Sequence, residues 1–135
     1  MQITKKVKGQ FVIFNISGNL DMNNVKFVKR IFDDEVNKGT KYVAIDMKNL
    51  SYIDSSGIGS FIGLMSKLRR VGGQVILLNM NPEIERIFSM TKLLAFFKVY
   101  KSEEEFLSST GETSAPEGKE PPSTPSTSSS DYSFW

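Results

Sequence analysis

Apolar and polar residues alternate near the start of the chain with the period of β-strands. Residues 2–8 alternate weakly, and residues 11–16 form a denser β-prone run. Gly9 and Gln10, between the two runs, are typical of a two-residue hairpin turn, because glycine readily adopts a positive φ. The pattern therefore predicts an antiparallel pair of strands.

Downstream, the pattern predicts strands that alternate with helices. Further β-prone runs lie at residues 42–47, 75–78 and 96–100. Apolar residues three or four positions apart predict a helix that begins near Met22 and a second one with its stripe at residues 58–68. Pro82, followed by acidic residues, is typical of the first turn of a third helix, and Ser102-x-x-Glu105 is typical of a capping box that opens a short last helix. The apolar stripe of the first helix includes Met22, with candidate N-caps at residues 21–24. The order β-β-α-β-α-β-α-β-α indicates an α/β fold with a mixed, mostly parallel sheet of four to five strands and about four helices.

Composition changes sharply near Ser109. Fifteen of the last 26 residues are Ser, Thr or Pro. Such a segment has too little apolar surface to offset the entropy lost on ordering. We therefore expect one domain at residues 1–109 and a disordered Ser/Thr/Pro-rich tail at 110–135. The aromatic end of the tail, residues 131–135, fits either a plain chain end or a short docking motif.

The charged and reactive residues exclude several function classes. The chain has 17 Lys+Arg, 15 Asp+Glu, no His and no Cys. This composition excludes Ser-His-Asp and Cys-His catalysis, thiol redox chemistry and thiolate zinc sites within the chain. It leaves open a carboxylate-only site for Mg²⁺ or Ca²⁺, but we expect no metal or cofactor. Basic residues are scattered, which argues against direct binding of nucleic acid. No apolar stretch approaches 18 residues and no signal peptide is visible, so we expect a cytoplasmic protein without membrane insertion.

Small and polar residues gather between the predicted strand at residues 42–47 and the stripe of the second predicted helix. Asp54-Ser55-Ser56-Gly57-Ile58-Gly59 places an acid, two hydroxyls and two glycines at this junction. A purely structural interpretation is that Asp54 or Ser55 caps the helix and that the glycines allow close packing. A functional interpretation is that a serine here is exposed and open to phosphorylation, which would add about −1.5 to −2 charge at a helix N-terminus.

Two motifs resemble those of a known family. Gly18-Asn19-Leu20-Asp21 is similar to a G-x-L-D segment, and the junction at residues 52–59 is similar to the D-S-[ST]-G-[LI]-G segment of the STAS domain of bacterial anti-sigma factor antagonists. The resemblance extends over about residues 2–108. It departs in one minor respect, because Asn19 stands where many relatives carry an acid.

The resemblance implies a function as an anti-sigma factor antagonist. In such a switch the unphosphorylated form binds an anti-sigma factor that is also a serine kinase, which releases a sigma factor. Phosphorylation, here at Ser56, turns binding off, and a PP2C-type phosphatase reverses it. The resemblance also implies a partner-binding surface formed by Asp21, Asp54, Ser55, Ser56 and Gly57.

Other functions fit the sequence less well. The same family resemblance also fits a non-catalytic STAS subunit of a lipid-transport ABC system or a stress-signalling scaffold. An enzyme is not expected. Lys67 follows Ser56 by 11 residues on the same predicted helix, about 16 Å along the axis, too far for a Ser-Lys pair. Gly57-Ile58-Gly59 lacks the Gly-Lys-Ser/Thr ending of a phosphate-binding P-loop.

Overall fold

The structure, a computed structural model, describes residues 1–110, so residues 111–135 of the predicted tail lie outside the described residues. The strands are β1 (Gln2–Lys8), β2 (Phe11–Leu20), β3 (Tyr42–Asp46), β4 (Leu50–Ile53), β5 (Gln74–Leu78) and β6 (Lys98–Tyr100). The helices are α1 (Val25–Asn37), α2 (Ser55–Arg70), α3 (Pro82–Thr91), the short 3₁₀ turn η1 (Leu94–Phe96) and α4 (Glu103–Thr110).

The strands form a mixed, mostly parallel α/β sheet in the order β1-β2-β3-β5-β6. The pair β1 and β2 is antiparallel, and the remaining pairs are parallel, as the sequence predicted. Gly9, in the turn between β1 and β2, has a φ of 59°, which is the conformation that favours glycine there. The β-prone run at residues 75–78 lies in β5, as predicted, and all four of its apolar residues are buried.

The structure differs from the predicted elements at three places. A sixth strand, β4, pairs in parallel with the far end of β2, which continues to Leu20 rather than ending at residue 16. The last strand is shorter than predicted, because η1 occupies Leu94–Phe96. The first helix starts at Val25, so Met22 lies in the turn before it and its side chain is 73% exposed. The polar residues that surround Met22 account for this, since they hydrogen-bond within the turn.

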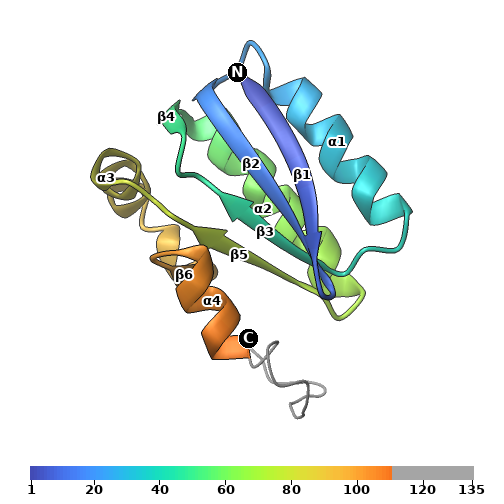
Figure 1. Cartoon of the computed structure of the whole chain (residues 1–135). Helices are drawn as coiled ribbons and strands as arrows, with labels where there is room; N and C mark the ends of the chain where they lie inside the picture. The colour runs from blue at the N-terminus through green and yellow to red at the C-terminus, as the bar shows by residue number, and fades with distance from the viewer. Residues whose placement is uncertain (111–135) are drawn as a thin grey trace. The chain divides into compact units, whose positions relative to one another are not determined.

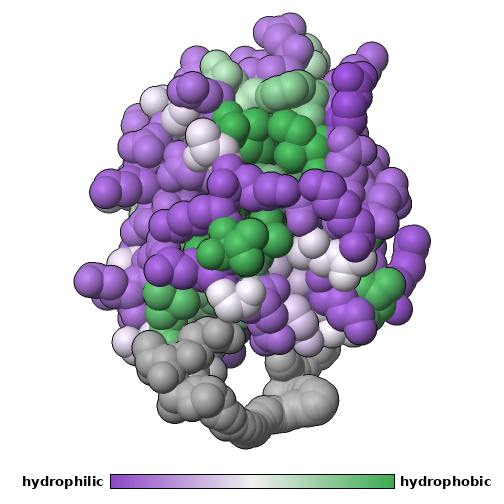
Figure 2. Space-filling view, turned by 45° about the vertical axis from the view of Figure 1, so that its right-hand side comes forward, coloured by the Kyte–Doolittle hydropathy of each residue, from purple (hydrophilic) through white to green (hydrophobic). Residues whose placement is uncertain are grey.

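Helices α1 and α2 lie next to each other along the sheet (Figure 1). Their apolar faces and the sheet enclose one core, through which five phenylalanine rings form a continuous series from β2 to the segment before β6. The series runs through Phe14, Phe32, Phe61, Phe88 and Phe97. The face of this body seen in Figure 2 is largely hydrophilic and is interrupted by separate hydrophobic areas.

The chain divides into two compact units. The first is Met1–Lys101 and contains the sheet, α1, α2 and α3; the second begins at Ser102. In the second unit the described element is α4, where the amide of Glu105 donates to Ser102 Oγ at 3.1 Å, as expected of the predicted capping box. A domain boundary at residue 109 stays a prediction.

Candidate phosphoacceptor site and docking surface

Two parallel strands end side by side and bring the two sequence motifs together. Leu20, the last residue of β2, is the register partner of Ile53, the last residue of β4. Across this pair the amide of Asp54 donates to the carbonyl of Leu20 at 3.2 Å. The turn that begins at Asp21 therefore lies beside the start of α2 (Figure 1). Strand β4, which the sequence pattern did not predict, is thus the element that assembles the site.

The carboxylate of Asp54 organises the first turn of α2. Asp54 is the N-cap, with extended backbone. Its Oδ1 accepts hydrogen bonds from the Ser56 hydroxyl at 2.6 Å and from the Gly57 amide at 3.0 Å. Of the two caps that the sequence left open, Asp54 is the one used, and the Ser55 side chain is exposed. The hydroxyl of Ser56 is therefore held in one orientation at the rigid start of a helix.

The second carboxylate oxygen of Asp54 reaches the turn after β2. Its Oδ2 accepts from the amide of Met22 at 3.1 Å. Side chains hold the rest of this turn: the amide of Asn23 donates to Asp21 Oδ1 at 3.0 Å, and the amide of Asp21 donates to Asn24 Oδ1 at 3.0 Å. Asp54 thus joins the two motifs through one carboxylate.

These contacts determine the ionisation of Asp54. Burial acts to raise the pKa of its carboxyl, but the hydrogen bonds from the Ser56 hydroxyl and from the amides of Gly57 and Met22 outweigh it. The pKa therefore lies below its ordinary value of 3.8, and the group is a carboxylate at neutral pH. Because a carboxylate only accepts, the Ser56 proton points to Asp54, and the lone pairs of Ser56 Oγ are left to meet an incoming electrophile.

Gly57 lies beneath this surface rather than on it. A Cβ added there would stand 2.7 Å from Ile53 Cγ1 and 2.9 Å from Leu20 Cγ. The absent side chain lets α2 approach the ends of β2 and β4 closely, as the structural interpretation of the motif expected. A Cβ at Gly59 would meet nothing within 4 Å, so the second glycine of the motif does not serve this packing.

Charge and exposure define the surface that the two motifs share. Asp21, Asp54 and Ser56 are partly exposed and Ser55 is exposed. The chain has no Lys or Arg between Lys8 and Lys26, or between Lys48 and Lys67, so Asp21 and Asp54 are the only charged residues of these two segments. Of the five residues predicted from the motifs, Asp21, Asp54, Ser55 and Ser56 come together at this surface, whereas Gly57 is buried beneath it. The role of these residues in partner binding stays a prediction.

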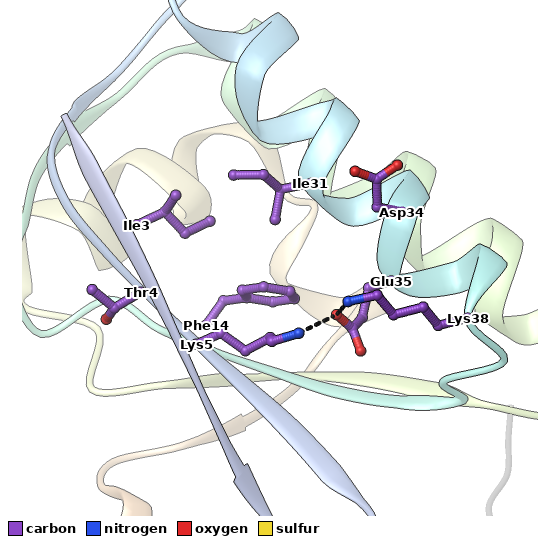
Figure 3. Close-up of a pocket in the computed structure, with 8 residues that line it drawn as sticks. All are labelled: Ile3, Thr4, Lys5, Phe14, Ile31, Asp34, Glu35 and Lys38. Carbon is purple, nitrogen blue, oxygen red and sulfur yellow. Dashed lines mark hydrogen bonds and ion pairs between the residues drawn. The ribbon is translucent and has the colours of Figure 1, made fainter.

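A separate cleft of about 260 Å³ lies between β1 and α1 (Figure 3). Ile3 and Ile31 face each other across it, and Phe14 lies below them. The buried carboxylate of Glu35 accepts from Lys5 Nζ at 3.1 Å, which ties the edge strand to the helix. No residue of the two motifs lines this cleft, so it is distinct from the Ser56 site.

In the part of the chain that the structure describes, no group of three or more Asp and Glu is placed to hold a metal ion. Lys67 Nζ bonds to Asp33 of α1, away from Ser56. Among residues 1–110, no helix has the length and the apolar character needed to cross a bilayer.

Comparison with known proteins agrees with this geometry. The model of the STAS domain family matches residues 2–106, so the chain belongs to the STAS domain family. An anti-sigma F factor antagonist of Paenibacillus polymyxa is 26% identical over 104 residues, which are 76% of this chain and 89% of that protein.

Two solved structures add to the comparison. The anti-sigma factor antagonist SpoIIAA in its unphosphorylated form superposes with a TM-score of 0.65 at 26% identity, over 81% of this chain and 96% of its own. The Bacillus cell fate determinant SpoIIAA in the phosphorylated form gives a TM-score of 0.63 at 26% identity, over 81% of this chain and 99% of its own. The likeness therefore spans nearly the whole of each of these proteins.

Sequence reasoning missed one member of the site, the amide of Met22. A backbone amide leaves no signal of its own in a sequence, and the apolar side chain of Met22 matched the helical stripe. The available signal was the run of polar residues around it, Asp21, Asn23 and Asn24, since Asp and Asn favour turns and caps over the interior of a helix.

Proposed function

We propose that this protein is an anti-sigma factor antagonist that is switched by phosphorylation of Ser56. The unphosphorylated form binds an anti-sigma factor with serine kinase activity and so releases a sigma factor; a PP2C-type phosphatase restores it. The observation that carries the proposal is the Ser56 hydroxyl, partly exposed and held by Asp54 at the start of α2. The names of the family relatives support the same function.

The geometry suits a protein substrate rather than an enzyme. For phosphoryl transfer the kinase must bring the γ-phosphate of ATP to about 3–3.5 Å from the acceptor oxygen. A rigid helix start presents that oxygen in one place, which limits the entropy that the kinase must remove. The chain needs no catalytic base of its own, because the kinase and its Mg·ATP supply the chemistry.

Electrostatics explains why a phosphate would end the binding. After transfer, a group of about −1.5 to −2 charge stands beside Asp54 and faces the remaining phosphates of the nucleotide. Two unit charges 5 Å apart repel by about 3 kcal/mol at an effective dielectric constant of about 20. That repulsion corresponds to a loss of about 100-fold in affinity, enough to empty the complex.

Phosphate incorporation tests the proposal. The wild-type chain, Ser56→Ala and Ser55→Ala are incubated with ATP and the anti-sigma kinase from the same cells, and phosphopeptides are mapped by mass spectrometry. Wild type and Ser55→Ala should take up one phosphate, at Ser56, and Ser56→Ala should take up none. Ser55→Ala is the matched control, because it removes the neighbouring exposed hydroxyl. Equal labelling of Ser56→Ala would overturn the assignment.

The affinity of each variant for the anti-sigma kinase tests the switch. Ser56→Ala should bind as wild type does, because Asp54 keeps its bonds to the amides of Gly57 and Met22. Ser56→Asp should bind at least about tenfold more weakly, since it adds a negative charge to the interface. Equal affinities of Ser56→Asp and wild type would refute the electrostatic account. Co-purification with a transporter ATPase instead of a kinase would refute the proposed partner.

A further inference from the structure

Asp54 is bonded at once to the proposed acceptor and to a second exposed segment. One oxygen accepts from Ser56 Oγ at 2.6 Å, and the other accepts from the amide of Met22 at 3.1 Å. Any change in charge at Ser56 therefore acts directly on the group that holds the turn at residues 21–24. The turn's other side-chain bonds are internal to it or reach Asn19, and the carboxylate of Asp54 links the turn to the start of α2.

The turn presents an apolar side chain in a polar setting. Met22 is 73% exposed, although it stands among Asp and Asn residues and its own amide is fixed. An exposed Met side chain is flexible and polarizable, so it can adapt to an apolar pocket of a partner, and a fixed backbone removes the cost of ordering the turn on binding. Its attachment to Asp54 places it on the same surface as Ser56.

Resting on the proposed function, we propose that Met22 is an anchor of the docking surface for the anti-sigma factor, and that phosphorylation of Ser56 loosens this anchor through Asp54. In phosphoserine the Oγ becomes an ester oxygen without a proton, so the bond that Ser56 Oγ donates to Asp54 is lost. The phosphate also repels the carboxylate, which turns away and releases the amide of Met22. Phosphorylation thus acts twice, by repulsion at Ser56 and by release of a contact that lies outside the modified residue.

Amide hydrogen exchange tests the release without any partner. The full chain is labelled with ¹⁵N and prepared as wild type, as Ser56→Ala, as Asp54→Ala, and with phosphoserine incorporated at position 56 during translation. Exchange at the amide of Met22 should be about tenfold faster in the phosphorylated protein and in Asp54→Ala. In Ser56→Ala it should stay within about twofold of wild type.

The amide of Ile84 is the matched internal control. It too donates to a side-chain oxygen, Asn81 Oδ1 at 2.9 Å, at the start of α3 and away from Ser56 and Asp54. Its exchange should not change in any of the four proteins. If the amide of Met22 exchanges at the wild-type rate in the phosphorylated protein, the coupling through Asp54 is wrong, whether or not a kinase partner exists.

Affinity tests the anchor. In the unphosphorylated protein, Met22→Ala should lower the affinity for the anti-sigma kinase about tenfold. Met90→Ala is the control, because Met90 is 77% exposed on α3 and lies outside both motifs. If Met22→Ala binds with wild-type affinity, Met22 is not an anchor. If Met22→Ala and Met90→Ala lose affinity equally, the loss is not specific to Met22, and the anchor is again refuted. If wild type itself binds no anti-sigma kinase, the proposed function fails, and the exchange experiment still decides the coupling.

Discussion

Replacement of Gly57 by alanine tests the packing on which the site rests. The new Cβ would stand 2.7 Å from Ile53 Cγ1, 2.9 Å from Leu20 Cγ and 3.1 Å from the Leu20 carbonyl oxygen. Ordinary carbon contacts lie near 3.5–4.0 Å, so the overlap is about 1 Å. Both neighbouring side chains are fully buried and have nowhere to move. Overpacking of this kind costs about 1–3 kcal/mol.

Gly59→Ala separates this cost from the intrinsic preference of alanine for helices. Both glycines lie in α2, and replacement of a helical glycine by alanine gains up to about 1 kcal/mol. At Gly59 the new Cβ meets nothing within 4 Å, so only the gain remains. The difference between the two variants is then the packing cost alone, about 1–3 kcal/mol.

Urea and thermal unfolding measure the difference. For a domain of about 60–100 residues, 1 kcal/mol moves the midpoint of thermal unfolding by about 4–8 °C. Gly57→Ala should therefore unfold at least about 4 °C below Gly59→Ala, and Gly59→Ala should equal or exceed wild type. Equal midpoints for the two variants would refute the close approach of α2 to the ends of β2 and β4.

The remaining predictions concern the cap, the core, pH and the tail. Asp54→Ala removes the N-cap of α2 and should cost about 1–2 kcal/mol in urea unfolding; a loss below about 0.3 kcal/mol would argue against the cap. Phe61→Ala, at a fully buried ring that contacts two others, should cost about 3–5 kcal/mol, and a smaller loss would mean a looser core. Burial acts to raise the pKa of Glu35, but the hydrogen bond from Thr40 and the charge of Lys5 lower it overall. The ionised Glu35 carboxylate therefore stabilises the fold at neutral pH, and this contribution should fade as the pH drops below about 4.5, the ordinary pKa. In urea unfolding at several pH values, the free energy of unfolding of Glu35→Gln should depend less on acid than that of wild type. Truncation after Ser109 should leave the midpoint of thermal unfolding unchanged, whereas a loss of many degrees would show that the removed residues stabilise the fold.

Much of the architecture was predictable because local signals and tertiary structure agree. The hairpin at Gly9, the apolar run of β5 and the stripe of α2 each depend on neighbours a few residues away. Residues 50–53 carried no such signal. The strand there is four residues long and has two exposed members, and it pairs with β2, whose partner residues Gly18–Leu20 come much earlier in the chain.

Sequence alone determined the candidate chemistry of this protein. The absence of His and Cys excluded several kinds of catalysis, and the two motifs indicated a family whose resemblance implies Ser56 as the phosphoacceptor. Tertiary structure decided how the motifs act together. Only pairing of β2 with β4 brings the turn at Met22 to Asp54, because a carboxylate bonds whichever donors the folded chain places within about 3 Å, and sequence spacing does not record those distances.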